Sequence, residues 1–449
     1  MPRLLLINPS NKKKGLGNIK ATAWPPLNLP YIAALTPSHY DITLIDENVE
    51  LFEMQPADIV GITAYSSSVF RGYEIAQLYK SKSVPVVMGG IHVSMLPDEA
   101  LQYCDAVVCG EAESVWPELL RDFENGRLKP KYDGQWQDLK HLPLPRRDIL
   151  KNGFYRWGSI QTSRGCPMNC DFCSVTAFNG NRFRRRPVES VVEELHQIPQ
   201  RLVLFADDNI CGYGKKDAEW TKSLFEEIIR QKIKKIFFAQ VSLNFGDDPQ
   251  LVELAYRAGL RVVLVGMESI NPVTLKSLNK QLNLKRLEEN RYQKLIDTIR
   301  KSGIAFLGAF ILGTDADTPD VFPATLKFIQ RARIDILQLT KPTPLPGTRL
   351  WDAMIRDNRI IDTDFPRAWD RYRLTKLVYE PKLMTIEAVY KGFTDLRTTF
   401  YRFDETLKRT LRTLLDTRSI TATLLSYKFN ASYRKAFLQS DHYKKYGRH

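Results

Sequence analysis

Short apolar runs alternate with helical patterns over the first third of the chain. Five of these runs have the length and character of buried strands, and they lie at 3–7, 42–45, 58–63, 84–88 and 105–109. Residues with the spacing of amphipathic helices fall between them, near 28–36, 70–82, 97–102 and 114–123. Because strands that alternate with helices form parallel sheets, we expect an α/β, doubly wound, Rossmann-like domain over 1–135.

The same alternation resumes after a proline-rich linker. The linker, which we place at 136–155, contains the run His141-Leu-Pro-Leu-Pro. Strands are then expected at 157–162, 201–206, 235–239, 261–265, 304–311 and 334–339. Helices are expected at 188–196, 216–230, 248–257, 272–277, 288–301 and 319–332. These repeated units predict a partial or full TIM-type β/α barrel over 156–350, with its chemistry at the carboxyl ends of the strands.

The strand signals stop near residue 352, and we assign 351–449 to a helical C-terminal module. Apolar residues recur with helical spacing over 385–415. The chain has a net charge of +14, and from Arg371 onward 17 Lys and Arg face 7 Asp and Glu. Such a basic segment is either a solvated surface or a contact for an anionic partner, namely lipid headgroups, nucleic acid or an acidic substrate.

Composition limits the class of protein. Hydrophobic residues make up 43% of the chain and charged residues 26%, as in ordinary soluble domains. No apolar stretch reaches the ~18 residues of a membrane span, and the run at 3–7 is too short for a signal peptide. Six cysteines in 449 residues, three of them clustered, do not form a disulfide framework. We therefore expect a cytoplasmic protein, either free or peripheral to a membrane.

The clustered cysteines are the strongest chemical signal in the sequence. Cys166, Cys170 and Cys173 have the spacing C-x3-C-x2-C, and the glycine, proline and asparagine beside them favour a tight loop. Three thiolates can hold an iron–sulfur cluster and leave one iron without a protein ligand, which is a position where chemistry can occur. Structural zinc or plain burial is the competing interpretation, although zinc needs a fourth ligand and the nearest downstream candidates are His196 and Cys211.

This spacing, with Phe172 before the last cysteine, resembles the radical S-adenosylmethionine (radical SAM) enzymes. The resemblance implies a 4Fe-4S cluster held by Cys166, Cys170 and Cys173, whose open iron binds S-adenosylmethionine (SAM). It also implies a flavodoxin- or ferredoxin-type electron donor, whose electron splits SAM into methionine and a deoxyadenosyl radical. No catalytic residue beyond the cluster ligands is assigned.

The resemblance extends to residues at the ends of the later strands. Carboxylates and amides suit the ammonium group of SAM, and Glu268 would accept hydrogen bonds from its ribose. The glycine of Phe310-Ile-Leu-Gly would let adenine approach the backbone. The implied SAM-binding residues are Phe172, Asp207, Asp208, Asn209, Gln240, Ser242, Glu268, Ser269, Phe310 and Gly313. The adjacent aspartates could also be turn or cap residues, and Arg164 beside the cysteines could pair with an anion or lie on the surface.

Three loops of the N-terminal domain follow strands and carry hydroxyls, glycines or carboxylates, which together make a crevice for a large cofactor. They resemble the cobalamin-binding domain that precedes many radical SAM cores. The implied cobalamin-binding residues are Ser66, Ser67, Ser68, Gly89, Gly90, His92, Gly110, Glu111 and Glu113. The D-x-H-x-x-G motif, whose histidine binds cobalt in other cobalamin proteins, is absent. The resemblance therefore implies cobalamin without a histidine on cobalt, or a domain that has lost cobalamin, and leaves His92 as a ligand or a buried hydrogen-bonded residue.

These features favour a cobalamin-dependent C-methyltransferase that acts on an unactivated carbon of a lipid or another small molecule. Radical cyclisation or rearrangement, with or without cobalamin, is the alternative reaction. A non-catalytic iron–sulfur protein for electron transfer or sensing is the alternative of another class. A nucleic-acid partner is disfavoured, because RNA-modifying enzymes with a similar core carry extra upstream cysteines, a set that Cys104 and Cys109 do not supply. Peripheral contact with a membrane through the basic C-terminal helices stays open.

Overall fold

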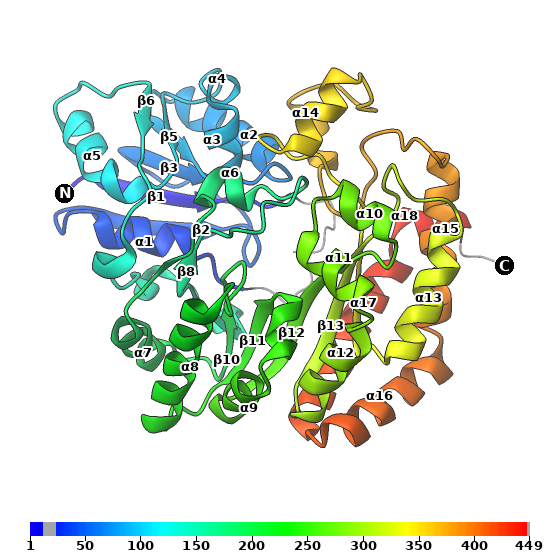
Figure 1. Cartoon of the computed structure of the whole chain (residues 1–449). Helices are drawn as coiled ribbons and strands as arrows, with labels where there is room; N and C mark the ends of the chain where they lie inside the picture. Colours follow the sequence, from blue (N-terminus) through cyan, green and yellow to red (C-terminus); the bar gives the residue numbers. More distant parts are fainter. Residues whose placement is uncertain (12–23, 447–449) are drawn as a thin grey trace.

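The computed structural model describes residues 1–11 and 24–446 (Figure 1). Its N-terminal domain is built on a six-stranded parallel sheet with the order β2-β1-β3-β4-β5-β6. The strands are β1 (Arg3–Asn8), β2 (Asp41–Asp46), β3 (Ile59–Thr63), β4 (Val86–Gly89), β5 (Ala106–Cys109) and β6 (Lys131–Asp133). The five predicted strands are confirmed. The edge strand β6 was not predicted, because its sequence Lys-Tyr-Asp carries too little apolar character.

Helices cover both faces of this sheet, as the doubly wound prediction requires. One face carries α1 (Asn28–Leu35) and α5 (Trp116–Glu124). The other carries α2 (Val69–Lys80), α3 (Ile91–Met95) and α4 (Pro97–Ala100). With this topology the loops that follow β3, β4 and β5 meet at the carboxyl edge of the sheet.

The linker region is made of three short 3-10 turns, η4 (Leu139–His141), η5 (Arg147–Ile149) and η6 (Asn152–Phe154). It packs on the N-terminal domain, where Leu150 and Tyr155 are buried against the sheet. The C-terminal end of this connection is therefore anchored on the N-terminal domain.

The second sheet is an open part of a barrel. Its strands are all parallel, in the order β14-β13-β12-β11-β10-β7. They are β7 (Trp157–Ile160), β10 (Leu202–Phe205), β11 (Ile236–Val241), β12 (Leu260–Glu268), β13 (Ala305–Ile311) and β14 (Ile336–Thr340). Because β7 and β14 form two separate edges, the barrel is the partial form of the two that the sequence predicts.

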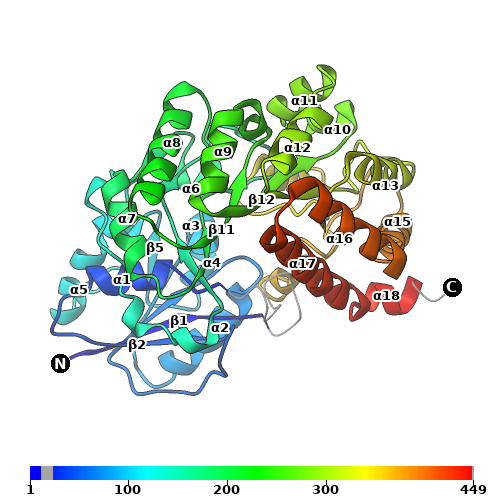
Figure 2. The same ribbon diagram turned by 90° about the horizontal axis from the view of Figure 1, so that it is seen from below.

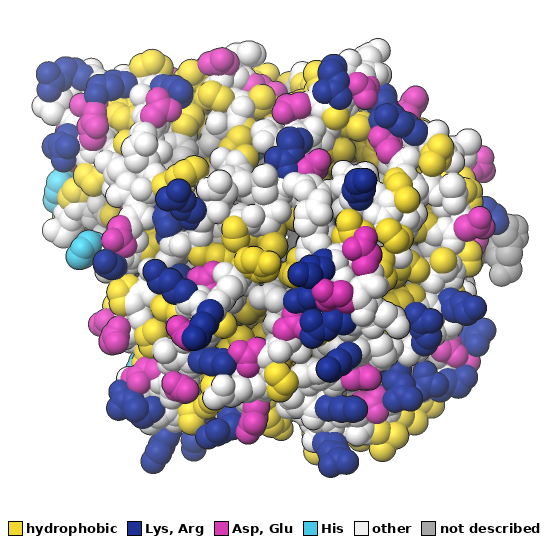
Figure 3. Space-filling view, in the orientation of Figure 1, with side chains coloured by type: hydrophobic (Ala, Val, Ile, Leu, Met, Phe, Trp, Pro, Cys, Tyr) yellow, Lys and Arg dark blue, Asp and Glu magenta, His cyan; other side chains and the backbone are white. Residues whose placement is uncertain are grey.

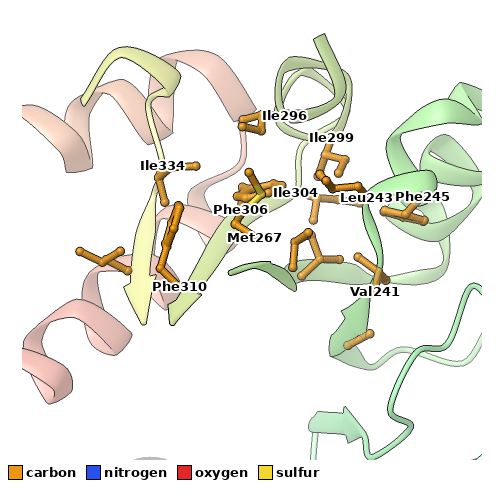
Figure 4. Packing of buried hydrophobic residues seen from close by; sticks show 14 of the residues in the cluster. Val241, Leu243, Phe245, Met267, Ile296, Ile299, Ile304, Phe306, Phe310 and Ile334 are labelled. Atoms are coloured by element: carbon orange, nitrogen blue, oxygen red, sulfur yellow. The ribbon is translucent and has the colours of Figure 1, made fainter. Parts of the chain in front are cut away.

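Amphipathic helices cover the convex face of the partial barrel. They are α7 (Val188–Gln197), α8 (Lys215–Arg230), α9 (Pro249–Ala258), α12 (Tyr292–Lys301) and α13 (Val321–Ala332). Figure 4 shows the core beneath them, where Met267 and Phe306 of the strands lie near Ile296 and Ile299 of α12. This large apolar cluster gives the strand ends a rigid support.

Shorter elements lie around the mouth of the barrel. They are the antiparallel pair β8 (Ser163–Arg164) and β9 (Arg184–Arg185), and the helices α6 (Val175–Asn179), α10 (Pro272–Ser277), α11 (Gln281–Glu288) and α14 (Arg349–Arg356). The helix predicted at 288–301 begins later, because Asn290 has a left-handed φ of +52° and separates α11 from α12.

The C-terminal module is helical, as predicted, and one of its helices covers the concave face of the barrel. Its helices are α15 (Ile386–Phe400), α16 (Phe403–Thr417), α17 (Ile420–Leu438) and α18 (Asp441–Tyr446). Leu425 and Phe429 of α17 are buried against Phe238 and Leu307 of the sheet. An open barrel would leave that apolar face in water, so α17 takes the place of the missing strands. Among the described helices none has the length and apolar character needed to cross a bilayer.

The segment before these helices packs on the N-terminal domain. Trp369, within the 3-10 turn η8 (Arg367–Arg371), is buried together with Tyr372 against α2. Its indole N–H donates to both carboxylate oxygens of Glu99 at 3.0 Å. The C-terminal module therefore contacts both sheets and holds them in one arrangement.

Candidate active site

A cavity of about 890 Å³ lies between the carboxyl edges of the two sheets. Loops of the N-terminal domain form one wall, at 8–11, 61–68, 89–92 and 110–113. The barrel contributes Ser159, Gln161 and Asp208, and residues 372–374 of the C-terminal module close one side. Because α/β folds bind ligands at the carboxyl ends of their strands, this cavity is the candidate active site.

The cysteine loop lies between β8 and α6 at the mouth of the barrel. Gly165 has a φ of +89°, and a Cβ there would lie 2.1 Å from the carbonyl oxygen of Arg182, so only glycine fits. The Cys166 N–H donates to the Gly180 carbonyl at 3.1 Å. At the other end, Arg349 Nε donates to the Asp171 carboxylate at 2.8 Å. The turn that ends in Arg349 thus holds the cysteine loop in place.

The three thiols of this loop are reduced, and Cys170 is buried while Cys166 and Cys173 are half-buried. Burial raises the pKa of all three, and that of Cys173 reaches about 12, so the thiolates need a cation beside them. Across the described ranges no three His, Cys, Asp or Glu side chains are placed to hold a single metal ion. A 4Fe-4S cluster binds each thiolate to a different iron, so three thiols spread along one loop fit it.

Alternation along the strands separates the predicted SAM residues into two sets. Gln240 and Glu268 share the parity of Phe238 and Leu264, which face the concave side, and Asp208 lines the cavity. The Asp208 carboxylate accepts one long hydrogen bond, from Asn179 at 3.4 Å. Burial, and then the charge of the adjacent aspartate, raises its pKa to about 6. A half-buried carboxylate that accepts only one long hydrogen bond from the protein is suited to bind an ammonium group of a ligand.

Glu268 occupies a strained position. Its φ is +59°, and the pairing of β12 with β13 shifts register between Gly266 and Glu268. Bulges and strained residues of this kind re-aim side chains and cluster at functional sites. Lys280 Nζ donates to Glu268 Oε1 at 2.8 Å and lies 5.9 Å from the centre of the Phe172 ring. Burial lowers the pKa of Lys280, but Glu268 and Cys170 outweigh it and raise the pKa overall, so this ammonium stays charged. Sequence reasoning missed Lys280, which no motif marks.

The second set supports the strand ends and does not face the cavity. Asp207 accepts a hydrogen bond from the Thr162 hydroxyl at 2.9 Å. Asn209 Nδ2 donates to the Ser242 hydroxyl at 2.7 Å. Ser269 is fully buried, and its hydroxyl accepts from the backbone N–H two residues on, at 3.0 Å. These hydrogen bonds hold the turns that carry the inward-facing residues.

Phe310 and Gly313 also contribute no side chain to the cavity. Phe310 is fully buried in the convex core, where its ring lies 6.3 Å from that of Phe328 (Figure 4). Gly313 has a φ of +89°, and its N–H donates to Asp317 Oδ2 at 3.0 Å. A Cβ on Gly313 would lie 3.1 Å from Val389 of α15. Only the backbone of this segment is available to a ligand.

The loops of the N-terminal domain bring backbone and small side chains to the cavity. Gly90 has a φ of +100°, and a Cβ there would crowd the Thr63 hydroxyl at 3.0 Å. His92 is buried, with Nδ1 3.0 Å from the Ser66 hydroxyl and Nε2 3.2 Å from a Glu99 oxygen. The other predicted residues of these two loops that line the cavity are Ser67, Ser68 and Gly89. Both ring nitrogens of His92 therefore already have protein partners.

The third loop contacts β8 and β9, the two short strands on either side of the cysteine loop. Arg164 Nη2 lies 2.6 Å from Glu113 Oε1, and its Nη1 lies 3.2 Å from Glu111 Oε2. Arg184 Nη1 donates to the same Glu111 oxygen at 2.9 Å. Burial would raise the pKa of Glu111, but Arg184 and Arg164 outweigh it and lower the pKa. We name this group the interdomain clamp (Glu111, Glu113, Arg164, Arg184). Gly110 has a φ of +76°, and a Cβ there would lie 2.4 Å from the carbonyl oxygen of Gly134, so a larger residue would not fit at this position.

Three aromatic residues of the cavity were not predicted from the sequence. Tyr65 leaves 62% of its surface exposed, and it lines the cavity. Enclosure by the walls, and then the charge of Asp208, raises the pKa of its phenol. The Trp24 indole N–H and the Tyr372 hydroxyl are buried polar groups that line the same cavity without a hydrogen-bond partner in the described structure. Buried donors are normally hydrogen-bonded, so two unpaired donors in the wall of a large cavity indicate that the cavity binds a ligand with polar acceptor groups.

Comparison with known proteins finds a family for the N-terminal domain and one for most of the barrel. Residues 16–120 match the B12 binding domain family, and residues 160–329 match the Radical SAM superfamily. The bacteriochlorophyllide d C-12(1)-methyltransferase of Chlorobaculum tepidum is 31% identical over 420 residues, which cover 90% of this chain and 88% of that relative. The hopanoid C-2 methylase of Rhodopseudomonas palustris is 28% identical and covers 77% of this chain and 67% of that relative.

The fold has a counterpart among solved structures. The radical S-adenosylmethionine methyltransferase TsrM of Kitasatospora setae, solved with cobalamin and a 4Fe-4S cluster bound, superimposes with a TM-score of 0.68. It is 17% identical, and the match covers 98% of this chain and 100% of that one, so the likeness is one of fold. The two family matches, and a relative that is 31% identical over nearly its full length, show the family. This chain belongs to the radical SAM enzymes that carry a B12-binding domain.

Proposed function

We propose that this enzyme is a cobalamin-dependent C-methyltransferase that acts on an unactivated carbon of a small molecule or lipid. The observation that carries the proposal is the single cavity of about 890 Å³, which reaches from the Gly89–Gly90 loop to Asp208 beside the cysteine loop. A substrate held there would be open to both cofactors at once. The methyltransferase names of the relatives support the same reaction class.

The residues of this chain fit the three cofactors of the family. Cys166, Cys170 and Cys173 would hold the 4Fe-4S cluster. Asp208 would receive the ammonium of SAM, and Glu268 its ribose hydroxyls. When bound, the reduced cluster cleaves SAM to a deoxyadenosyl radical, and methylcobalamin supplies the methyl group.

Cobalamin would lie against the N-terminal wall of the cavity. The Gly89–Gly90 backbone allows close approach, and Tyr65 projects from the neighbouring loop. The Trp24 N–H and the Tyr372 hydroxyl would gain hydrogen-bond acceptors on the cofactor. No histidine would ligate cobalt, because the ring nitrogens of His92 are engaged with protein.

The protein's own contribution would be to orient the cofactors and exclude water. The pair of Lys280 with Glu268 holds a carboxylate ready at the bulge of β12. We retain 1–135, 136–155, 156–350 and 351–449 as the proposed domain division, and a flavodoxin- or ferredoxin-type protein as the proposed electron donor.

The test is a reaction with methyl-labelled SAM. Cluster-reconstituted enzyme is supplied with cobalamin, a reductant and candidate substrates, and the label is followed by mass spectrometry together with deoxyadenosine. We expect one labelled methyl group in the product. Cys170→Ala should abolish both readouts, whereas Cys104→Ala, at a buried cysteine outside the loop, should leave both in place. Deoxyadenosine with an unlabelled, cyclised or rearranged product would overturn methyl transfer and favour the alternative reaction.

A further inference from the structure

Exposed apolar side chains are concentrated on one pair of helices. Of the 21 large hydrophobic residues that are exposed within the described part of the chain, eight fall between residues 403 and 427. They are Phe403, Leu407, Leu411, Leu414, Leu415, Ile420, Leu424 and Tyr427. We name them the α16–α17 strip. A soluble surface carries single exposed apolar residues routinely, but a contiguous group of this size marks a contact site.

The spacing of these residues places them along one face of each helix. In α16 they recur every three or four residues from Phe403 to Leu415, and in α17 from Ile420 to Tyr427. Phe403, Leu415 and Ile420 are 79%, 74% and 71% exposed. The two helices contact each other and lie side by side toward the viewer in Figure 2.

Folding does not require this strip. The opposite face of α17, with Leu425 and Phe429, is already buried against the concave face of the barrel. Thr413 and Thr417 form the buried side of α16. These helices therefore carry a second apolar face that no described part of the chain covers, in addition to the face that holds them on the barrel.

The charges beside the strip are positive. The only acidic residues between 402 and 438 are Asp404, Glu405 and Asp416. Each of them already has a basic partner, at 2.6, 3.2 and 2.7 Å respectively. The exposed cations of the same stretch include Arg412, Arg418, Lys428, Arg434 and Lys435. In Figure 3 hydrophobic side chains lie beside Lys and Arg at the lower right, over α16.

We propose that the α16–α17 strip docks this enzyme on the surface of an anionic lipid bilayer. Exposed leucines give apolar area to bury at the level of the headgroups, and the flanking cations are attracted to anionic lipid. Either signal alone gives only marginal binding, and the strip supplies both. The cations also argue against a second copy of this chain as the occupant, because two copies of the strip would repel each other.

Vesicle flotation tests the proposal. Cluster-reconstituted enzyme is mixed with phosphatidylcholine vesicles, with or without phosphatidylglycerol, and the bound fraction is measured. We expect binding to the vesicles that contain phosphatidylglycerol. Replacing Leu411 and Leu415 together, as Leu411→Asp with Leu415→Asp, should weaken it by at least about tenfold. The matched control is Leu51→Asp, at an N-terminal-domain leucine that is 83% exposed, and it should bind as the wild type does.

A second set of variants measures how much of the vesicle binding is electrostatic. Arg412→Glu or Lys428→Glu should each weaken binding to the anionic vesicles by about fivefold or more, and added salt should narrow the difference. Lys82→Glu, an exposed lysine of the N-terminal domain, is the matched control. SAM cleavage in solution should be unchanged in every variant, which shows that the fold and the cluster are intact.

Three results would overturn the proposal. The first is wild-type protein that floats with neither kind of vesicle. The second is binding that the leucine variants retain. The third is light scattering that shows a wild-type dimer which Leu411→Asp with Leu415→Asp converts to monomer, since the strip would then be a contact between copies. None of these results bears on methyl transfer, which the labelled-SAM experiment tests in solution.

Discussion

The two walls of the cavity are built on different principles. On the barrel wall, Asp208 offers a carboxylate that accepts a single long hydrogen bond of 3.4 Å. Glu268, at the end of the neighbouring strand β12, carries a second carboxylate, which is paired with Lys280. On the N-terminal wall, the histidine and the glutamates already have protein partners. His92 bonds Ser66 and Glu99, and Glu111 bonds two arginines.

The two walls can therefore hold ligands in different ways. The barrel wall can bind through charge, which suits the zwitterionic methionine part of SAM. The N-terminal wall can bind through backbone groups, hydroxyls and aromatic rings, which suits a large cofactor with many weak contacts. Glu111 and Glu113, which the sequence suggests as cobalamin-binding residues, line the cavity and join one wall to the other through Arg164.

Breaking the interdomain clamp should have the largest effect. Arg164 and Glu111 are both buried, so Arg164→Gln leaves a buried carboxylate without one of its partners. We expect a loss of about 3 kcal/mol in the free energy of unfolding, measured by chemical denaturation. We also expect labelled methyl transfer to fall further than deoxyadenosine formation, because only transfer needs the two walls in register.

The pH dependence checks the cause of that loss. The pKa of folded-state Glu111 is lowered, so its ion pairs stabilise the protein above the ordinary carboxyl range and are lost as the pH falls through the lowered value. The stability gap between wild type and Arg164→Gln should therefore narrow in acid. Arg146→Gln, which removes an exposed pair with Asp148, is the control and should change stability by less than about 1 kcal/mol. A similarly small effect at Arg164 would contradict the clamp.

Removing the free carboxylate of the barrel wall should have an intermediate effect. Asp208→Asn should weaken SAM binding by about tenfold, or 1.4 kcal/mol, because an amide receives an ammonium group less strongly than a carboxylate does. The pKa of Asp208 is about 6, so wild-type binding should weaken as the pH falls through that value while the variant stays flat. Isothermal titration with SAM across this range measures both, and a pH-independent wild type would place the ammonium elsewhere.

The same residue should show the opposite sign in stability. Burial raises the pKa of Asp208 above its ordinary value, so the folded protein holds this proton more tightly than the unfolded chain does. Stability without ligand therefore falls as the pH rises toward 6, and Asp208→Asn should recover about 2 to 3 kcal/mol at neutral pH. Thermal unfolding at two pH values checks this. An equal destabilisation at both would show that the carboxylate supports the fold.

The sequence predicted much of the fold because its signals are local. Strand after strand, apolar runs such as 58–63 and 304–311 fall where β3 and β13 lie. What escaped prediction depends on partners distant in the chain. Strand β6 exists because it pairs with β5, and α17 covers the concave face because the barrel is open. Neither β5 as a pairing strand nor the open barrel can be inferred from the residues next to β6 or α17 in the sequence.

The site was predicted at the level of loops but not of side chains. Motifs identify the turn that carries Asp207, Asp208 and Asn209, yet only strand parity decides that Asp208 faces the cavity. Lys280 could not have been found, because it reaches Glu268 at the end of β12 from the turn between α10 and α11. Arg349 likewise has its partner far away in the chain, because it donates to Asp171 in the cysteine loop.

The smallest expected effect separates backbone from side chain at the barrel wall. Phe310 lies in the convex core, so Phe310→Leu should cost about 1 kcal/mol of unfolding free energy and leave the Kd for SAM unchanged. Gly313→Ala is the comparison, since it adds a Cβ at a left-handed φ and 3.1 Å from Val389. That change should move the backbone of the turn and raise the Kd. If Phe310→Leu instead raised the Kd as much as Gly313→Ala does, the ring would have to act on the ligand through the turn. The division of the barrel wall into inward-facing ligands and outward-facing support would then fail at this strand.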